Sequence, residues 1–182
     1  MKKKSVIKTI LLWTFEILVV ILFAYVLVYF FGQSRTNIGQ SMDVTLSGGD
    51  TVLLNVLSYR VSAPKRGDVI AFKPNGSTTS HSSIKRVIAL PGETVQIDEN
   101  GKIYINGEVL EENYGAETIR SAGRASEPIT LGENEYFVMG DNRNNSKDSR
   151  SEDVGNVSRS QIIGRAWVRI WPLSKIGVLK HQ

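Results

Sequence analysis

The sequence has 182 residues, of which 41% are hydrophobic, and it carries a formal net charge of +4. This length is enough for one well-cored domain with an appendage, and it excludes two large domains. The chain has no cysteine, which excludes a disulfide framework, a thiol nucleophile and a metal site built on thiolates, so that only His81 and His181 could offer imidazole. We expect no metal and no other cofactor.

The excess positive charge belongs to the first eight residues. Before residue 32 the charged residues are Lys2, Lys3, Lys4, Lys8 and Glu16, which leaves 18 basic and 17 acidic residues for the rest of the chain. That remainder is nearly neutral, so it does not indicate a basic surface suited to phosphate groups. We therefore expect no nucleic acid as a partner.

An apolar run of 22 residues, 10–31, follows these lysines. As a helix it would span about 33 Å, which matches the hydrocarbon core of a bilayer. The alternative is a cleavable signal peptide, whose apolar region has only about 7 to 15 residues and ends at a small-x-small site. Residues 30–34 offer no such site, so we predict an uncleaved anchor in contact with the lipid bilayer.

The position of the lysines predicts the orientation of this anchor. The basic tail, 1–9, precedes it and only Arg35 follows closely, so we expect the N-terminus in the cytoplasm and residues 32–182 outside, as in a single-pass plasma-membrane protein. Glu16 lies inside the anchor. A carboxylate that reaches the cytoplasmic headgroups, or is protonated in place, is one interpretation, and contact with another membrane protein is the alternative.

Beyond the anchor the pattern becomes that of strands and turns, which predicts a mainly β domain. Asn100-Gly101 and Asn106-Gly107 mark tight turns. Residues 73–83 form a flexible connection and 111–132 a polar insertion. The segments predicted as strands are all rich in Val, Ile, Tyr, Phe and Trp: 51–57, 68–73, 84–90, 94–98, 102–106, 135–139 and 162–171.

The third of these segments carries two adjacent cations, Lys85 and Arg86. Side chains alternate between the two faces of a strand, so Lys85 shares a face with Val87, while Arg86 shares the other with Ile84 and Ile88. One of the two cations must then point toward an interior, and Lys85 is a candidate general base. The alternative is an edge strand from which both long side chains reach water.

Three further segments could carry chemistry. Ser41 lies in Ile38-Gly39-Gln40-Ser41-Met42-Asp43-Val44-Thr45-Leu46, about ten residues beyond the anchor; alone, such a serine would be a turn former. Arg66-Gly67-Asp68 is a turn that leads into a strand. The segment 140–150, Gly-Asp-Asn-Arg-Asn-Asn-Ser-Lys-Asp-Ser-Arg, is too dense in polar groups to be an ordinary surface turn.

These four segments, in this order after an N-terminal anchor, closely resemble the bacterial type I signal peptidases, also called leader peptidases, in their single-anchor Gram-positive form. The resemblance covers nearly the whole chain, including residues 163–166 and Trp171-Pro172. It implies an all-β domain of antiparallel sheets and a serine endopeptidase that removes signal peptides from exported preproteins after small residues at positions −1 and −3. Exported preproteins are then the substrates, and the secretion translocon is a candidate partner.

The resemblance also implies roles for individual residues. Ser41 would be the nucleophile and Lys85 the general base, with Ser146 orienting the lysine amine. The oxyanion hole would rest on the backbone N–H of Ser41, with Gly39 allowing close approach of the substrate backbone. The site would be braced by Asp148, Arg150, Asp141 and Arg86. Our candidates for the shallow substrate pockets are Ile38, Met42, Leu46 and Ile84.

A lysine acts as a base only when it is neutral. Its ordinary pKa of about 10.4 leaves about one molecule in a thousand deprotonated near pH 7.4, and burial away from carboxylates can lower that pKa by up to about 3 to 5 units. We therefore expect Asp148 to pair with Arg150 or Arg143 rather than with Lys85.

Several alternatives stay open. The family usually has proline where this chain has Val44, which motivates a catalytically impaired, membrane-anchored binding or assembly module, such as a pilus-associated relative. A serine–histidine hydrolase would use His81. A self-cleaving repressor with a serine–lysine pair would be expected to carry a DNA-binding domain, whereas this chain has an anchor in that place.

Overall fold

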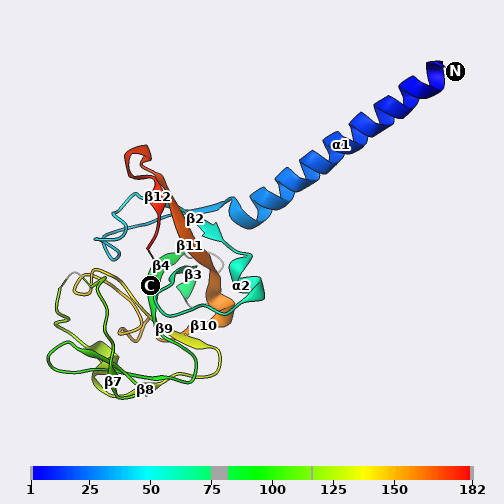
Figure 1. Cartoon of the computed structure of the whole chain (residues 1–182). Helices are drawn as coiled ribbons and strands as arrows, with labels where there is room; N and C mark the ends of the chain where they lie inside the picture. Colours follow the sequence, from blue (N-terminus) through cyan, green and yellow to red (C-terminus); the bar gives the residue numbers. More distant parts are fainter. Residues whose placement is uncertain (1, 75–81, 116, 181–182) are drawn as a thin grey trace.

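The computed structural model describes residues 2–74, 82–115 and 117–180. His81 and His181 lie outside these residues, as does most of the predicted connection 73–83. The described chain divides into one long helix and a β domain (Figure 1).

The N-terminal helix, α1 (Lys2–Phe31), projects away from the β domain (Figure 1). Its segment Val6–Tyr29 has a mean hydropathy of 2.6 and is not buried against the rest of the protein. This length and this apolar surface fit a single-pass membrane anchor. The helix stops at Gly32, whose N–H still donates to Val28 O at 2.8 Å, and the first strand starts at the next residue.

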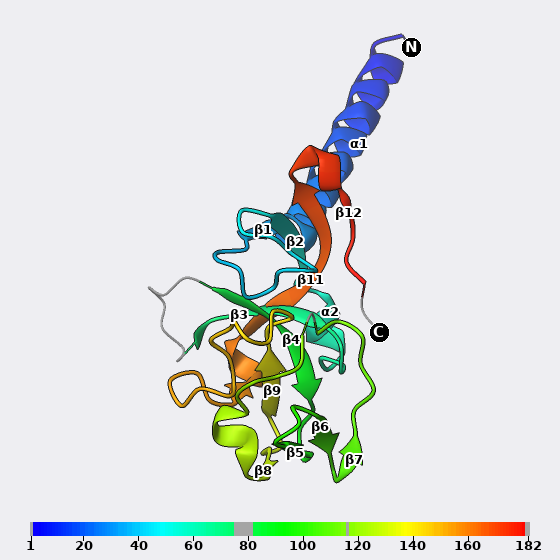
Figure 2. The same ribbon diagram turned by 90° about the vertical axis from the view of Figure 1, so that its left-hand side faces the viewer.

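In the described residues, eight strands form one antiparallel sheet with the order β1-β2-β11-β3-β4-β9-β10, and the eighth, β12, pairs with β11. A smaller antiparallel sheet has the order β7-β6-β5-β8 and lies at the end of the domain far from α1 (Figure 2). The strands of the large sheet are β1 (Gln33–Thr36), β2 (Thr51–Asn55), β3 (Val69–Phe72), β4 (Ser83–Ala89), β9 (Glu135–Met139), β10 (Val157–Ser158), β11 (Ile162–Trp171) and β12 (Gly177–Val178). Those of the small sheet are β5 (Thr94–Ile97), β6 (Ile103–Ile105), β7 (Glu108–Val109) and β8 (Ile129–Thr130). The short helices are α2 (Ser58–Val61), η2 (Gly123–Ser126), η3 (Arg159–Gln161) and η4 (Leu173–Lys175).

All seven predicted strands are present, with ends within two residues of the prediction. The Asn106-Gly107 turn is also confirmed: both residues have positive φ, 53° and 84°, and the flanking residues Ile105 and Glu108 pair across it. Asparagine and glycine tolerate this left-handed conformation, which is why the dipeptide predicts the hairpin. The strands that were not predicted are β1 and the two-residue strands, which are too short to show a period.

The segment 111–132 differs from the expected polar insertion. Ile119, Ala125 and Leu131 are buried in one cluster with Val95 and Ile105 of the small sheet. Three apolar side chains, widely spaced in a polar sequence, show neither strand nor helix period, so their common burial was not visible in the pattern. The segment is thus part of the core that supports the small sheet.

Strand β4 is central, because β3 and β9 pair with its two edges. This excludes the edge-strand alternative. Lys85 and Arg86 are both buried, with 5% and 1% of their surfaces exposed, so both cations point to interiors where the sequence required only one to do so.

Candidate active site

Ser41 and Lys85 are in contact. The Lys85 amine donates to Ser41 Oγ at 2.7 Å and to the carbonyl oxygen of Ile84 at 3.1 Å. Ser41 comes from the loop between β1 and β2, and Lys85 from the middle of the large sheet, so the fold joins residues that are 44 positions apart.

The Ser41 loop is held by buried apolar side chains. Met42 and Leu46, one turn apart and joined by a backbone hydrogen bond of 2.7 Å, are fully buried in a cluster with Val52 and Ile84. The Asn37 amide donates to Leu46 O at 3.0 Å and closes the loop. Met42 and Leu46 thus anchor the nucleophile loop, and they expose no surface that a substrate could contact, which differs from their expected place in the substrate pockets.

Burial lowers the pKa of Lys85, although the nearby carboxylates of Asp148 and Asp141 act to raise it. Desolvation is the larger effect. It disfavours the charged ammonium and leaves the amine better able to accept a proton from Ser41.

Both carboxylates near Lys85 are paired with arginines instead. Asp148 accepts from Arg150 Nε and Nη2, each at 2.9 Å, and also from the backbone N–H of Gly140 at 3.0 Å. Asp141 accepts from Arg86 Nε at 2.8 Å and Nη2 at 2.7 Å. The expected pairing of Asp148 with arginine rather than with Lys85 is confirmed, and such two-bond pairs hold the surrounding loop rigidly.

Ser146 lies beside the pair without bonding to it. Its buried Oγ has no hydrogen-bond partner among the described residues, so the expected bond to Lys85 is not formed in this structure. Ser146 is nevertheless close to the nucleophile, because a Cβ added to Gly140 would collide with both Ser41 O and Ser146 Oγ.

Gly140 is therefore a site residue that the sequence reasoning missed. Any side chain at this position would push apart the backbone of Ser41 and the hydroxyl of Ser146. The available signal was a glycine that begins the polar segment 140–150, directly after the predicted strand 135–139.

The candidate oxyanion hole lies at the start of the same loop. The backbone N–H of Ser41 donates no hydrogen bond to the residues that the structure describes, so it remains available to a substrate oxygen. Gly39 has φ of +80°, and a Cβ there would meet nothing within 4 Å, so glycine serves here for its conformation and not because of crowding.

Val44 has an unusual backbone. Its φ is +89° and its side chain is 74% exposed. A proline, with φ fixed near −65°, cannot adopt this conformation, so the turn after the nucleophile differs from one that proline would make.

A groove of about 470 Å³ adjoins the Ser41–Lys85 pair. Ile38 and Ile84, two of the four predicted pocket residues, line it, together with Asn37 and Ser82 to Lys85. In the described residues, no group of three or more histidine, aspartate and glutamate side chains is placed to hold a metal ion.

Comparison with known proteins gives a consistent set of relatives. A family model described as signal peptidase, peptidase S26, matches residues 10–171. A probable signal peptidase I-2 of Synechocystis sp. is 38% identical over 156 residues, which cover 82% of this chain and 68% of the relative. A signal peptidase IB of Staphylococcus aureus is 31% identical over 192 residues, which cover 96% of this chain and 95% of the relative. Among solved structures, a signal peptidase I from Enterococcus faecalis V583 is 33% identical, has a TM-score of 0.46, and covers 57% of this chain and 97% of that chain.

Proposed function

The chain belongs to the signal peptidase family, peptidase S26, and we propose that Ser41 and Lys85 are its catalytic pair. As a family member it is a serine endopeptidase that removes signal peptides from exported proteins. The observation that supports the pair is the 2.7 Å contact between Lys85 Nζ and Ser41 Oγ, made by a lysine whose burial lowers its pKa. Acyl transfer needs such a nucleophile within hydrogen-bond reach of a base that is able to lose its proton.

In the proposed reaction Ser41 Oγ attacks the scissile carbonyl carbon while neutral Lys85 takes the hydroxyl proton. The backbone N–H of Ser41 stabilises the oxyanion. Lys85 then gives its proton to the leaving amine, the C–N bond breaks, and an ester with Ser41 remains. Lys85 takes a proton from water, and the resulting hydroxide attacks the ester carbonyl carbon. The bond to Ser41 Oγ breaks, Lys85 returns the proton to Ser41 Oγ, and the new carboxyl end of the signal peptide is released.

The groove beside the pair supports a substrate bound as an extended chain. Its two walls are Asn37 to Ile38 and Ser82 to Lys85. Strand β9 pairs with β4 only at Arg86 to Ala89, so the β9 side of residues 83–85 can pair with a peptide. With Ile38 and Ile84 in the walls, we expect small side chains to enter at positions −1 and −3, which corresponds to cleavage after small-x-small sites.

The anchor helix leads us to propose a topology. The lysines before α1 favour a cytoplasmic N-terminus and an extracytoplasmic β domain, where exported preproteins emerge from the translocon. Protease added outside cells with a permeable wall should digest residues beyond 32. Full protection of the β domain would contradict this orientation.

The test of the catalytic pair is cleavage of a preprotein by the detergent-solubilised protein, with the new N-terminus identified by mass spectrometry. Ser41→Ala and Lys85→Ala should each abolish most cleavage while the circular dichroism spectrum is retained. His81→Ala should cleave nearly as fast as the wild type. An inactive His81→Ala protein would favour the serine–histidine alternative, and an inactive wild type would favour the impaired binding module.

A further inference from the structure

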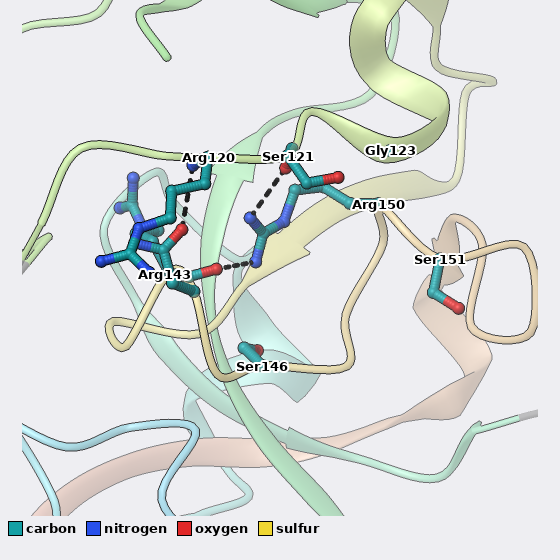
Figure 3. A pocket seen from close by; sticks show the side chains of 8 residues that line it. Arg120, Ser121, Gly123, Arg143, Ser146, Arg150 and Ser151 are labelled. Atoms are coloured by element: carbon teal, nitrogen blue, oxygen red, sulfur yellow. Dashed lines mark hydrogen bonds between the residues drawn. The ribbon is translucent and has the colours of Figure 1, made fainter.

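Ser146 lines a second cavity, of about 290 Å³. We call it the basic pocket, and its lining includes Arg120, Ser121, Arg143, Ser146, Arg150 and Ser151. They come from two loops, one before η2 and the other after β9 (Figure 3). Ser146 lines the basic pocket, and Ser41 lines the substrate groove. Both residues lie beside Gly140, so the basic pocket adjoins the catalytic pair.

The elements beside the two cavities extend toward different ends of the domain. The substrate groove is bounded by the Ser41 loop, which follows β1 at the end near α1, whereas η2, beside the basic pocket, lies toward the end occupied by the small sheet (Figure 2). A substrate that enters the groove from the α1 end would continue past the scissile bond toward the basic pocket.

The ionisable side chains that line this pocket are all arginines. The carboxylates that neutralise Arg143 and Arg150, namely Glu112 and Asp148, are 12% and 0% exposed and do not line it. Arg143 Nη2 is buried and has no hydrogen-bond partner among the described residues. The surface offered to a ligand thus consists of guanidinium, hydroxyl and amide groups.

Arg120 is the arginine best able to engage a ligand. It pairs with Glu117 at 3.4 Å, but the two side chains are 79% and 57% exposed, and exposed pairs of this kind are weak. A ligand carboxylate can replace Glu117 with little loss. Arg143 and Arg150 are held in fixed positions by their buried pairs with Glu112 and Asp148.

We propose that the basic pocket binds an acidic side chain of the exported protein within the first residues after the scissile bond. The enzyme then favours preproteins whose mature part begins with aspartate or glutamate, and Arg120 is the residue that determines this preference. The inference rests on Ser41 and Lys85 as the reacting pair.

The experiment compares three peptides with the same small-x-small site, which differ only in the residues just after the scissile bond: glutamate, glutamine or lysine. For the wild type in detergent, kcat/KM should be about two- to fivefold higher for the glutamate peptide than for the glutamine peptide, and lowest for the lysine peptide. Arg120→Gln should bring the glutamate-to-glutamine ratio close to one, and Arg120→Glu should favour the lysine peptide. Lys65→Gln removes an exposed charge that does not line the pocket and should keep the wild-type ratio.

Inorganic phosphate tests whether the ligand of the basic pocket is a substrate carboxylate or any free anion. If the inference holds, phosphate slows the glutamate peptide more than the glutamine peptide, and Arg120→Gln removes the difference. Equal rates for all three peptides, or a phosphate effect that is independent of the peptide, would overturn it. Both results leave the proposed function intact, because its own test is separate: Ser41→Ala should fail to cleave the glutamine peptide.

Discussion

Lys85 and Arg86 are adjacent on β4 and equally deep, yet the two faces of the strand surround them differently. The Lys85 amine bonds to the Ser41 hydroxyl and the Ile84 carbonyl and forms no ion pair with the residues that the structure describes. Arg86 has two bonds to Asp141, donates to Gly67 O at 2.7 Å and lies 4.1 Å from the centre of the Tyr114 ring.

The difference follows from the chemistry of the two cations. A guanidinium keeps its charge at any accessible pH, so a buried arginine must be paired. An amine can lose its proton, and a buried lysine without a carboxylate partner is driven to do so. Similar burial thus makes one residue a structural support and the other a base.

The largest effect on activity is expected from Lys85→Arg, which places a permanently charged cation on both faces of β4. Because arginine cannot deprotonate near neutral pH, kcat/KM should fall at least about 1000-fold, or about 4 kcal/mol, as measured by peptide cleavage. Arg86→Lys, the reverse change, keeps the base and should retain far more activity. A Lys85→Arg protein with more than a tenth of the wild-type rate would exclude lysine as the base.

Arg86→Met should affect stability more than any change on the Lys85 face. It leaves Asp141 buried without its partner, which costs about 3 to 5 kcal/mol of unfolding free energy, measured by denaturant unfolding in detergent. Arg120→Met, at a position 79% exposed, is the control and should change the unfolding free energy by less than about 0.5 kcal/mol. Equal losses in the two variants would show that the buried pair is not structural.

The sequence predicted best those features that depend on local preferences. It predicted least well those that depend on how distant segments pack together. Period-two strands and the Asn106-Gly107 turn follow from local preferences and were predicted. Ser41 and Lys85 were identified as a pair from a family resemblance. Met42 and Leu46 follow the nucleophile in sequence, and their four-residue spacing puts both in the core. A linear pattern does not show whether such an apolar side chain is buried beneath a site or exposed to the substrate. The crowding that a Cβ on Gly140 would meet, and the pocket that Arg120 and Arg150 both line, depend on the folded chain alone.

Gly140→Ala and Ser146→Ala probe how closely the Lys85 face is shaped. The added methyl group of Gly140→Ala must displace Ser41 O or Ser146 Oγ, and a misplacement of about 1 Å costs on the order of 100-fold in rate.

Ser146→Ala removes one hydroxyl and should lower kcat/KM by about 5- to 150-fold if that hydroxyl orients the lysine during the reaction, whereas Ser146→Thr should lose less. A Ser146→Ala protein as fast as the wild type would limit this serine to packing.

The pH dependence of stability tests the protonation of Lys85 directly. Burial lowers the pKa of Lys85 from its ordinary value of 10.5. Between the lowered pKa and 10.5 the unfolded chain binds a proton that the folded chain does not, so unfolding free energy rises with pH, by up to about 1.4 kcal/mol per unit. Below the lowered pKa both states are protonated and this contribution is flat.

Subtracting the unfolding free energy of Lys85→Met isolates this contribution, because the other titrating groups are common to both proteins. The difference in unfolding free energy should increase with pH. The pH at which this increase begins should coincide with the acid limb of kcat/KM, where the rate falls because protonated Lys85 cannot accept the Ser41 proton. Arg86, always charged, should give no such slope in Arg86→Met. A flat difference for Lys85→Met up to pH 10.5, together with an acid limb near that pH, would mean that burial does not shift the lysine and that the two faces of β4 hold their cations in the same charged state.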